Sequence, residues 1–175
     1  EDALGAVNTA ENVVEVQPAI NFNYFLPVNI VFGSGKVRKV GELTRPYGKK
    51  ALIVTGRSSA KKSGLYDKVN DSLKAAGIET ALFDKVQQNP LTTTAAEGAT
   101  YAKENGCDVV VAIGGGSIMD CAKAIAFLAL NEGDVSDYIF GKKASDKALP
   151  LILIPTTCGT GSEGNGFAVC KAVKS

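Results

Sequence analysis

Apolar residues follow two different patterns along the chain, and both occur next to each other in its middle. Residues 109–113 are consecutive apolar positions, most of them β-branched, which predicts a strand buried on both faces. Residues 114–116 are glycines that end this strand, and a second apolar run, rich in Ala, continues to Leu130. This run is too long for a strand and predicts a helix. Ser117 and Asp120 have the spacing of a capping box, which predicts that the helix begins at Ser117.

A glycine turn between a strand and a helix is suited to binding an anion. Without Cβ atoms in the way, backbone N–H groups and the positive end of the helix dipole point outward toward a ligand. The alternative is a tight turn that needs glycine only for its backbone angles. Three glycines in a row, followed by a capped helix, favour a phosphate or pyrophosphate site over that alternative. The sequence contains no P-loop pattern.

The alternation of strand and helix extends over most of the chain. The pattern predicts further strands at 50–55, 79–83 and 149–154, and helices at 36–43, 65–76, 92–105 (capped by Thr92) and, as a single turn, 134–140. Residues 25–32 predict one more strand, at an edge or in a hairpin because Pro27 interrupts it. Strand and helix repeat at about 30 residues, the length of a βαβ unit. We therefore predict an α/β fold: a Rossmann-like parallel sheet with helices on both faces, preceded by this short strand or hairpin.

In a parallel sheet, ligands bind beyond the carboxyl ends of the strands, and four loops are expected to converge there. These loops are residues 56–59, 87–90, 114–117 and 156–162. The last contributes the hydroxyls of Thr156, Thr157 and Thr160, which suit ribose or phosphate, although a flexible polar loop explains them equally well. The GxGxxG pattern at 159–164 is not the usual dinucleotide fingerprint, because too few residues follow it to complete a βαβ unit.

Charge and cysteine content narrow the possible functions. Lys and Arg (19) nearly balance Asp and Glu (18), so nothing in the charge recruits nucleic acid or an anionic membrane. No apolar run approaches the roughly 20 residues that span a bilayer. The four cysteines form no CxxC pair, which indicates reduced thiols in a cytoplasmic protein. The absence of histidine excludes a Ser-His or Cys-His pair and a His-rich metal site, so neither Cys121 nor Cys158 is favoured as a nucleophile.

Two further features bear on a nucleotide site. Gly56 follows the strand at 50–55, where an NAD-preferring site commonly has a carboxylate for the ribose 2′-OH. With no carboxylate there, and with Ser58, Ser59 and three basic residues nearby, NADP is favoured over NAD. Asp120 and Lys123 share one helix face near the glycines. They are either neighbours of a bound nucleotide's sugar or a capping carboxylate and a solvated lysine.

Two long motifs, at 114–123 and 155–163, together resemble the iron-containing (group III) alcohol dehydrogenases. Shorter segments at 32–35, 54–56 and 88–90 support the resemblance, which extends from about Phe25 to Val169. It implies an NAD(P)-binding α/β domain, here residues 21–175, followed in the family by a helical domain. It also implies hydride transfer between NADPH and a small alcohol or aldehyde, and a possible homodimer. Residues 1–20 lie outside the resemblance and are expected to be a flexible extension.

The resemblance assigns cofactor roles to residues already singled out. Gly115, Gly116 and Ser117 would hold the pyrophosphate, and Asn89, next to Pro90, would lie near the nicotinamide-side ribose. The family's glycine variant at position 56 typically accompanies NADP use, in agreement with the charge argument. The other contacts that the resemblance implies are Asp120 and Lys123 in the nucleotide cleft, Thr156, Thr157 and Thr160 at adenosine and phosphate, and Phe167 and Val169 flanking the cofactor.

The chain departs from the family in one respect that concerns the chemistry. Family members bind catalytic iron or zinc through one aspartate and three histidines, all beyond the glutamate matched here by Glu163. Because this sequence has no histidine, the metal that polarises the alcohol oxygen lacks its ligands here. We therefore expect a truncated dehydrogenase half that binds NADPH without oxidising alcohols at the family's rate.

Two alternatives to this hypothesis remain. The first is a noncatalytic NADPH-binding module, or a half-enzyme whose partner chain supplies the helical domain. The second is a relative such as dehydroquinate synthase or glycerol-1-phosphate dehydrogenase, which carry similar glycine motifs. The stretch at 155–163 favours the alcohol dehydrogenases over these relatives, with small primary alcohols and aldehydes as the substrate class that the resemblance implies.

Overall fold

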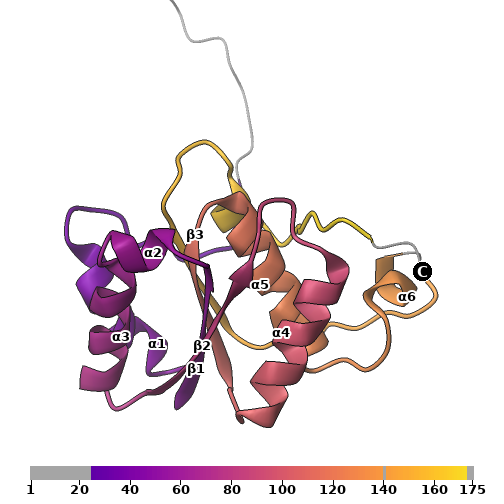
Figure 1. Cartoon of the computed structure of the whole chain (residues 1–175), viewed down its shortest axis with the longest axis horizontal. Helices are drawn as coiled ribbons and strands as arrows, with labels where there is room; N and C mark the ends of the chain where they lie inside the picture. The colour runs from indigo at the N-terminus through magenta and orange to yellow at the C-terminus, as the bar shows by residue number, and fades with distance from the viewer. Residues whose placement is uncertain (1–24, 140, 173–175) are drawn as a thin grey trace, which may run out of the picture.

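A sheet of four parallel strands forms the centre of the computed structural model, which describes residues 25–139 and 141–172. The strands lie in the order β2-β1-β3-β4, and every neighbouring pair is parallel (Figure 1). Their bounds are β1 Lys50–Gly56, β2 Glu79–Val86, β3 Val109–Gly114 and β4 Leu151–Pro155. The predicted α/β class and the predicted parallel sheet are therefore confirmed.

Helices cover both faces of this sheet. One face carries η1 (Lys36–Lys39), α1 (Val40–Thr44), α2 (Ser59–Lys62) and α3 (Leu65–Ala75), and the other carries α4 (Thr92–Glu104) and α5 (Gly116–Leu128). In Figure 1, α1–α3 lie to the left of the strands and α4 and α5 to the right. The short elements α6 (Val135–Ile139) and η2 (Ser162–Gly164) follow later in the chain. None of the helices within the described ranges is long and apolar enough to cross a membrane.

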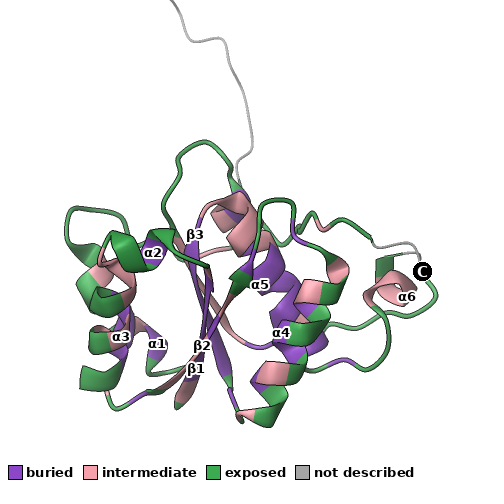
Figure 2. Cartoon of the chain, in the orientation of Figure 1, coloured by how far each residue is buried: buried purple, intermediate pink, exposed green. Residues whose placement is uncertain are grey.

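Alternation of side chains along the inner strands divides the core into two halves. Ile53 and Val111 belong to the cluster under α1 and α3, whereas Leu52 and Val110 belong to the cluster under α4 and α5. All six residues of β3 are buried, as expected of a strand between two layers of helices. Figure 2 shows this burial as purple along β1 and β3. The two central strands are thus held from both sides, which fixes the position of the loops that follow them.

Two helix starts differ from the predictions. α5 begins at Gly116, and no side chain caps it. The predicted capping box is therefore wrong, because the side chains of Ser117 and Asp120 bond instead to the backbone and side chains of other loops. α4 has Leu91 at its N-cap position, so Thr92 is its first residue and not its cap.

Residues 25–32 form no strand, which corrects the prediction of an edge strand or hairpin there. Phe25 and Phe32 are 85% and 92% exposed, and no described strand pairs with this segment. An apolar run becomes a strand only where a neighbouring strand can take its hydrogen bonds, and the sequence does not show that requirement. The helical turn predicted at 134–140 is present as α6. The extension predicted for residues 1–20 lies outside the described residues.

Gly41→Ala is expected to destabilise the chain, although alanine normally favours a helix over glycine. A Cβ at this position would lie 1.9 Å from the carbonyl oxygen of Ser72, a backbone atom of α3. Overpacking of this kind costs about 1–3 kcal/mol, which urea denaturation would measure. Gly166→Ala is the control, because its new methyl group meets no atom within 4 Å. An unchanged unfolding midpoint for Gly41→Ala would contradict the described packing of α1 on α3.

Candidate functional site

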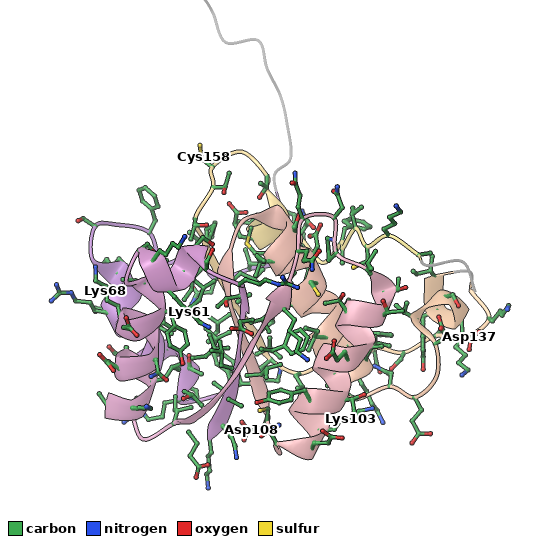
Figure 3. The ribbon with its side chains drawn as sticks, in the orientation of Figure 1. Lys61, Lys68, Lys103, Asp108, Asp137 and Cys158 are labelled. Atoms are coloured by element: carbon green, nitrogen blue, oxygen red, sulfur yellow. The ribbon has the colours of Figure 1, made fainter. Side chains whose placement is uncertain are left out.

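The loops that follow the four strands meet at one edge of the sheet. Because all strands are parallel, their carboxyl ends lie together, and the loops at 56–59, 87–90, 114–117 and 156–162 converge there as predicted. In Figure 3 the label of Cys158 marks the loop after β4 at this edge. The chain leaves β1 for β2 on one side and returns to place β3 on the other, so the strand order reverses between β1 and β3. Ligands of open α/β sheets bind at such a reversal.

Two segments define the centre of the site. They are the glycine turn (residues 114–116), which joins the end of β3 to the start of α5, and the threonine loop (residues 156–160), which follows β4. Parallel pairing of β3 with β4 brings them together, although they are far apart in the sequence. At their base the N–H of Thr156 donates to the carbonyl oxygen of Gly114 at 2.9 Å. The two motifs that the sequence singled out are therefore parts of one structure.

The threonine loop lies directly against the glycine turn because the turn has no Cβ atoms. A Cβ on Gly115 would lie 3.0 Å from Oγ1 of Thr157, and one on Gly116 would lie 3.3 Å from the Cβ of Thr160. Both distances are tighter than most Cβ contacts in proteins. No side chain caps α5, so N–H groups of its first turn have no side-chain partner there. This combination of backbone donors and hydroxyls can bind phosphate oxygens.

Asn89 is held in a left-handed backbone conformation, with φ of 52°. Among the residues that the structure describes, it is the only non-glycine residue with a positive φ. This conformation is strained, because a residue before proline is normally extended. Strained backbone of this kind tends to occur at ligand sites. The N–H of Asn89 donates to Oγ of Ser117 at 3.4 Å, and the carbonyl oxygen of Pro90 accepts from the N–H of Lys171 at 2.8 Å. The structure thus brings Asn89, Pro90 and Ser117 together at the start of α5.

Asp120 and Lys123 face the chain that follows β4. The Lys123 side chain is only 8% exposed, and its amine donates to Oγ of Ser162 at 2.9 Å and to the carbonyl oxygen of Phe167 at 2.6 Å. The Asp120 carboxylate accepts from Oγ of Ser162 at 2.6 Å and from the N–H of Val169 at 3.2 Å. Burial lowers the pKa of Lys123, and the Asp120 carboxylate opposes that shift. The reading as a capping carboxylate and a solvated lysine is therefore wrong.

The end of β1 presents Gly56 to the site, followed by the exposed Ser58 and Ser59. The sequence analysis missed one carboxylate near the end of β1. Asp84, on the neighbouring strand β2, pairs with Lys61 of α2, and this hydrogen bond holds the pKa of Asp84 below its usual value. Alternation along β2 could have placed Asp84 on the same face of the sheet as α2. One of the three basic residues counted near Gly56 is thus already paired with an acid.

Phe167 and Val169 lie at the rim of the site. Their side chains are 84% and 76% exposed, and it is their backbone atoms that bond to α5. The structure therefore leaves both apolar side chains open to a ligand or a partner.

Cys121 is not placed for nucleophilic chemistry. Cys121 is fully buried in α5, and desolvation, aided by nearby Cys170 and Asp120, raises the pKa of its thiol to about 12. A thiol that stays protonated at neutral pH is a poor nucleophile. This agrees with the sequence analysis, which did not favour Cys121 as a nucleophile.

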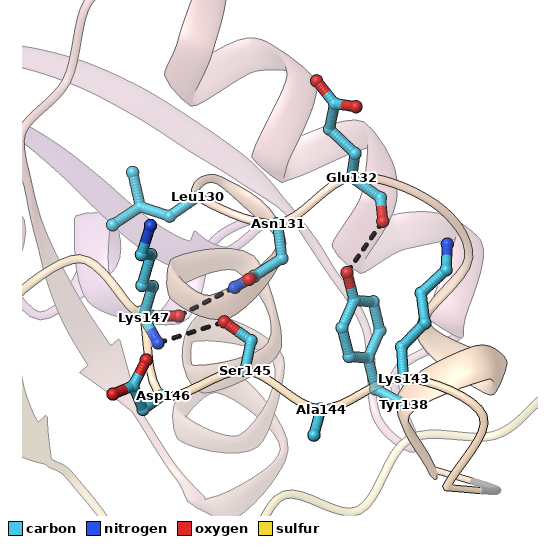
Figure 4. A pocket seen from close by; sticks show the side chains of 9 residues that line it. All are labelled: Leu130, Asn131, Glu132, Tyr138, Lys143, Ala144, Ser145, Asp146 and Lys147. Atoms are coloured by element: carbon cyan, nitrogen blue, oxygen red, sulfur yellow. Dashed lines mark hydrogen bonds between the residues drawn. The ribbon is translucent and has the colours of Figure 1, made fainter.

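A hollow of about 550 Å³ lies at the other end of α5 (Figure 4). It is lined by Leu130, Asn131, Glu132, Tyr138 and residues 143–147. Several of its polar groups bond to one another: the Tyr138 hydroxyl donates to the carbonyl oxygen of Glu132, and the Asn131 amide donates to that of Lys147. α5 separates this hollow from the glycine turn by about 20 Å of helix. The hollow is therefore not part of the candidate site.

The described residues do not fit the iron or zinc that the resemblance implies. Within residues 25–139 and 141–172, no three His, Cys, Asp or Glu side chains are grouped so that they could hold a metal ion. The sequence also offers no histidine as a nitrogen donor. No metal-dependent step is therefore assigned to the described residues.

A model of the family described as iron-containing alcohol dehydrogenase matches residues 27–175. NADH-dependent butanol dehydrogenase A of Clostridium acetobutylicum is 39% identical over 150 residues, which are 86% of this chain and 39% of that protein. NAD-dependent methanol dehydrogenase of Bacillus methanolicus is 40% identical over 148 residues, which are 84% of this chain and 39% of that protein.

A solved structure agrees with these sequence matches. The crystal structure of NADH-dependent butanol dehydrogenase A from Thermotoga maritima matches with a TM-score of 0.81 at 42% identity, covering 87% of this chain and 38% of that one. The chain spans about two-fifths of the length of the relatives it matches. A family model that covers most of the chain, together with these relatives, establishes that the chain belongs to the iron-containing alcohol dehydrogenase family.

Proposed function

We propose that this chain binds NADPH and provides the cofactor half of an alcohol dehydrogenase that moves hydride between NADPH and a small alcohol or aldehyde. The observation that carries the proposal is the contact between the threonine loop and the glycine turn at the uncapped start of α5. The N–H groups and the positive dipole end of such a helix attract a pyrophosphate. Membership of an alcohol dehydrogenase family, with relatives named for butanol and methanol, supports the reaction class.

Each loop of the proposed site binds a different part of the cofactor. The backbone of Gly115 and Gly116 and the hydroxyl of Ser117 hold the pyrophosphate. Asn89, whose N–H donates to Oγ of Ser117, binds with Pro90 near the nicotinamide-side ribose. The other proposed contacts are Gly56, Ser58 and Ser59 at the adenine-side ribose, Thr156, Thr157 and Thr160 at adenosine and phosphate, and Phe167 and Val169 at the flanks.

The part of this chain in the reaction is to bind the cofactor and orient its nicotinamide ring. When bound in the family's enzymes, the metal acts as a Lewis acid toward the alcohol oxygen. Since the described residues do not fit such a metal, their only role in the reaction is to bind and orient the nucleotide that carries the hydride. The same observation favours a second candidate function, a noncatalytic NADPH-binding module or a half-enzyme that needs a partner chain.

Mixing this chain with a separately produced helical domain of a relative distinguishes the two candidate functions. Metal-dependent alcohol oxidation that appears only in the mixture would support the dehydrogenase half. Tight NADPH binding by this chain, with no turnover in a mixture whose domains demonstrably associate, would support the noncatalytic module.

The proposed preference for NADPH over NADH rests on residues 56–62, which include the end of β1 and the chain that follows it. No carboxylate occupies the position of Gly56, so no acidic side chain at that position repels a 2′-phosphate, and the nearby Asp84 carboxylate is paired with Lys61. Arg57 and Lys62 are exposed nearby, whereas Lys61 is paired with Asp84. The relatives above are named as NADH- or NAD-dependent, so cofactor choice is the part of the proposal that most needs measurement.

Four further expectations stay proposals: the domain bounds, the cellular location, the absence of nucleic-acid and membrane partners, and the oligomeric state. The cofactor-binding domain is proposed to comprise residues 21–175, in a cytoplasmic protein whose charge gives it no affinity for nucleic acid or membranes. A homodimer is the proposed assembly, and exposed Phe25 and Phe32 provide apolar surface for it.

Gly56→Asp is expected to weaken NADPH binding by about tenfold or more, because the new carboxylate repels the 2′-phosphate. NADH binding should change less or become tighter, since the carboxylate can accept a hydrogen bond from the 2′-hydroxyl. Calorimetric titration with both nucleotides measures the two dissociation constants. Ser145→Asp adds the same charge at the hollow beyond α5 and serves as the control. The proposed preference is refuted if the unchanged chain binds NADH as tightly as NADPH.

Gly115→Ala is expected to raise the dissociation constant for NADPH about tenfold or more, with little loss of thermal stability. The new methyl group would lie 3.0 Å from Oγ1 of Thr157 and would push the threonine loop off the turn. Gly166→Ala, whose methyl group meets no atom within 4 Å, should bind like the unchanged chain. Equal affinity of all three proteins would mean that the pyrophosphate binds elsewhere.

A further inference from the structure

Three side chains form a closed hydrogen-bonded ring between α5 and the chain that follows the threonine loop. The Lys123 amine donates to Oγ of Ser162 at 2.9 Å, and that same hydroxyl donates to Oδ1 of Asp120 at 2.6 Å. The amine is also 3.6 Å from Oδ1 of Asp120, which closes the ring. Ser162 is 6% exposed, and the Asp120 and Lys123 side chains are 16% and 8% exposed. Little water therefore competes for these bonds.

The ring extends to the backbone of the chain that follows. The Lys123 amine donates to the carbonyl oxygen of Phe167 at 2.6 Å and approaches Oδ1 of Asn165 at 3.4 Å. The second carboxylate oxygen of Asp120 accepts from the N–H of Val169 at 3.2 Å. Two side chains one turn apart on α5 thus hold residues 162–169 at several points.

The ring also reaches the threonine loop itself. The N–H of Ser162 donates to Oγ1 of Thr160 at 3.4 Å, and Thr160 lies against Gly116 at the start of α5. The chain after β4 is therefore fixed to α5 twice, at the first turn through glycine contacts and at the next turn through the ring.

Burial of the Lys123 amine does little for the stability of the fold, which points to another reason for its position. Desolvation of the amine is unfavourable, and replacing a buried ion pair by apolar groups is often neutral or stabilising. The carboxylates of Asp120 and Glu163 offset part of that cost, and one Glu163 oxygen is buried with no hydrogen-bond partner in the described structure. What the amine supplies is a set of directed bonds from one rigid helix to one loop.

We propose that Lys123, together with Asp120 and Ser162, is a positioning clamp that holds the threonine loop on the glycine turn, and that Lys123 itself does not touch the cofactor. This inference rests on the proposed nucleotide site, and it replaces the expectation that Asp120 and Lys123 line the nucleotide cleft. Without the clamp, the loop detaches and the hydroxyls of Thr157 and Thr160 lose their places beside the start of α5.

Lys123→Met tests the clamp in the 175-residue chain, because methionine keeps much of the apolar volume and removes the donor. Amide hydrogen exchange in residues 157–169 is expected to accelerate about tenfold or more, while exchange in α5 and β3 stays unchanged. The dissociation constant for NADPH should rise about tenfold or more. Lys103→Met, which removes an exposed lysine at the far end of α4, is the control and should change neither quantity.

Ser162→Ala breaks the ring while leaving the Lys123 charge in place, so it provides a second test if Lys123→Met folds poorly. It should also loosen the loop and weaken binding, and its effect combined with that of Lys123→Met should be smaller than the sum of the two. Lys123→Arg, which keeps a cation with several donors, should lose less affinity than Lys123→Met.

The outcomes separate the clamp from its alternatives. Weaker NADPH binding with unchanged loop exchange would make Lys123 a direct cofactor contact and would overturn the proposal. A general loss of protection that includes α5, with unchanged affinity per folded molecule, would make it a structural residue and would overturn it as well. If the chain without substitutions binds neither nucleotide, the proposed function fails. The clamp is tested separately in that case: it is refuted if amide exchange in residues 157–169 is the same in Lys123→Met as in the chain without substitutions.

Discussion

The close approach of two backbone segments at the carboxyl edge of the sheet is the constraint on which the candidate site depends. A Cβ atom on Gly115 or Gly116 would press on Thr157 or Thr160, so glycine at both positions lets the threonine loop lie this close to the helix start without a shift. Gly114 has a further role, because a Cβ there would lie 2.4 Å from the side chain of Ile118. The glycine run therefore has two effects. Gly114 lets the first turn of α5 pack closely on the end of β3, and Gly115 and Gly116 let the threonine loop lie against the helix start.

The rest of the fold holds these two segments in register. β3 is buried along its whole length between the helices of the two faces, and β4 pairs with it residue by residue up to the site. A one-residue slip between β3 and β4 would move the threonine loop by more than 3 Å along the sheet. Such a shift is enough to separate hydroxyls from the backbone donors beside them. The hydrophobic core thus has a functional consequence, because it sets the spacing of polar groups at its edge.

The sequence predicted what depends on local pattern, and it failed where the outcome depends on a distant partner. Strands, glycine turn and converging loops follow from apolar periodicity and parallel topology, and the structure has them. The capping box did not form, because the hydroxyl of Ser117 and the carboxylate of Asp120 found partners in loops far away in the sequence. The same limitation explains the missing strand at 25–32 and the unforeseen pairing of Lys61 with Asp84.

Backbone amide shifts in an NMR titration with NADPH would test the central claim most directly. If the pyrophosphate binds at the uncapped start of α5, the amide signals of residues 115–117 and of the threonine loop should shift first and furthest. Signals from the hollow at 143–147 should stay in place. Saturable shifts centred on that hollow, or binding that leaves the signals of residues 115–117 unmoved, would contradict the assignment of this edge of the sheet as the cofactor site.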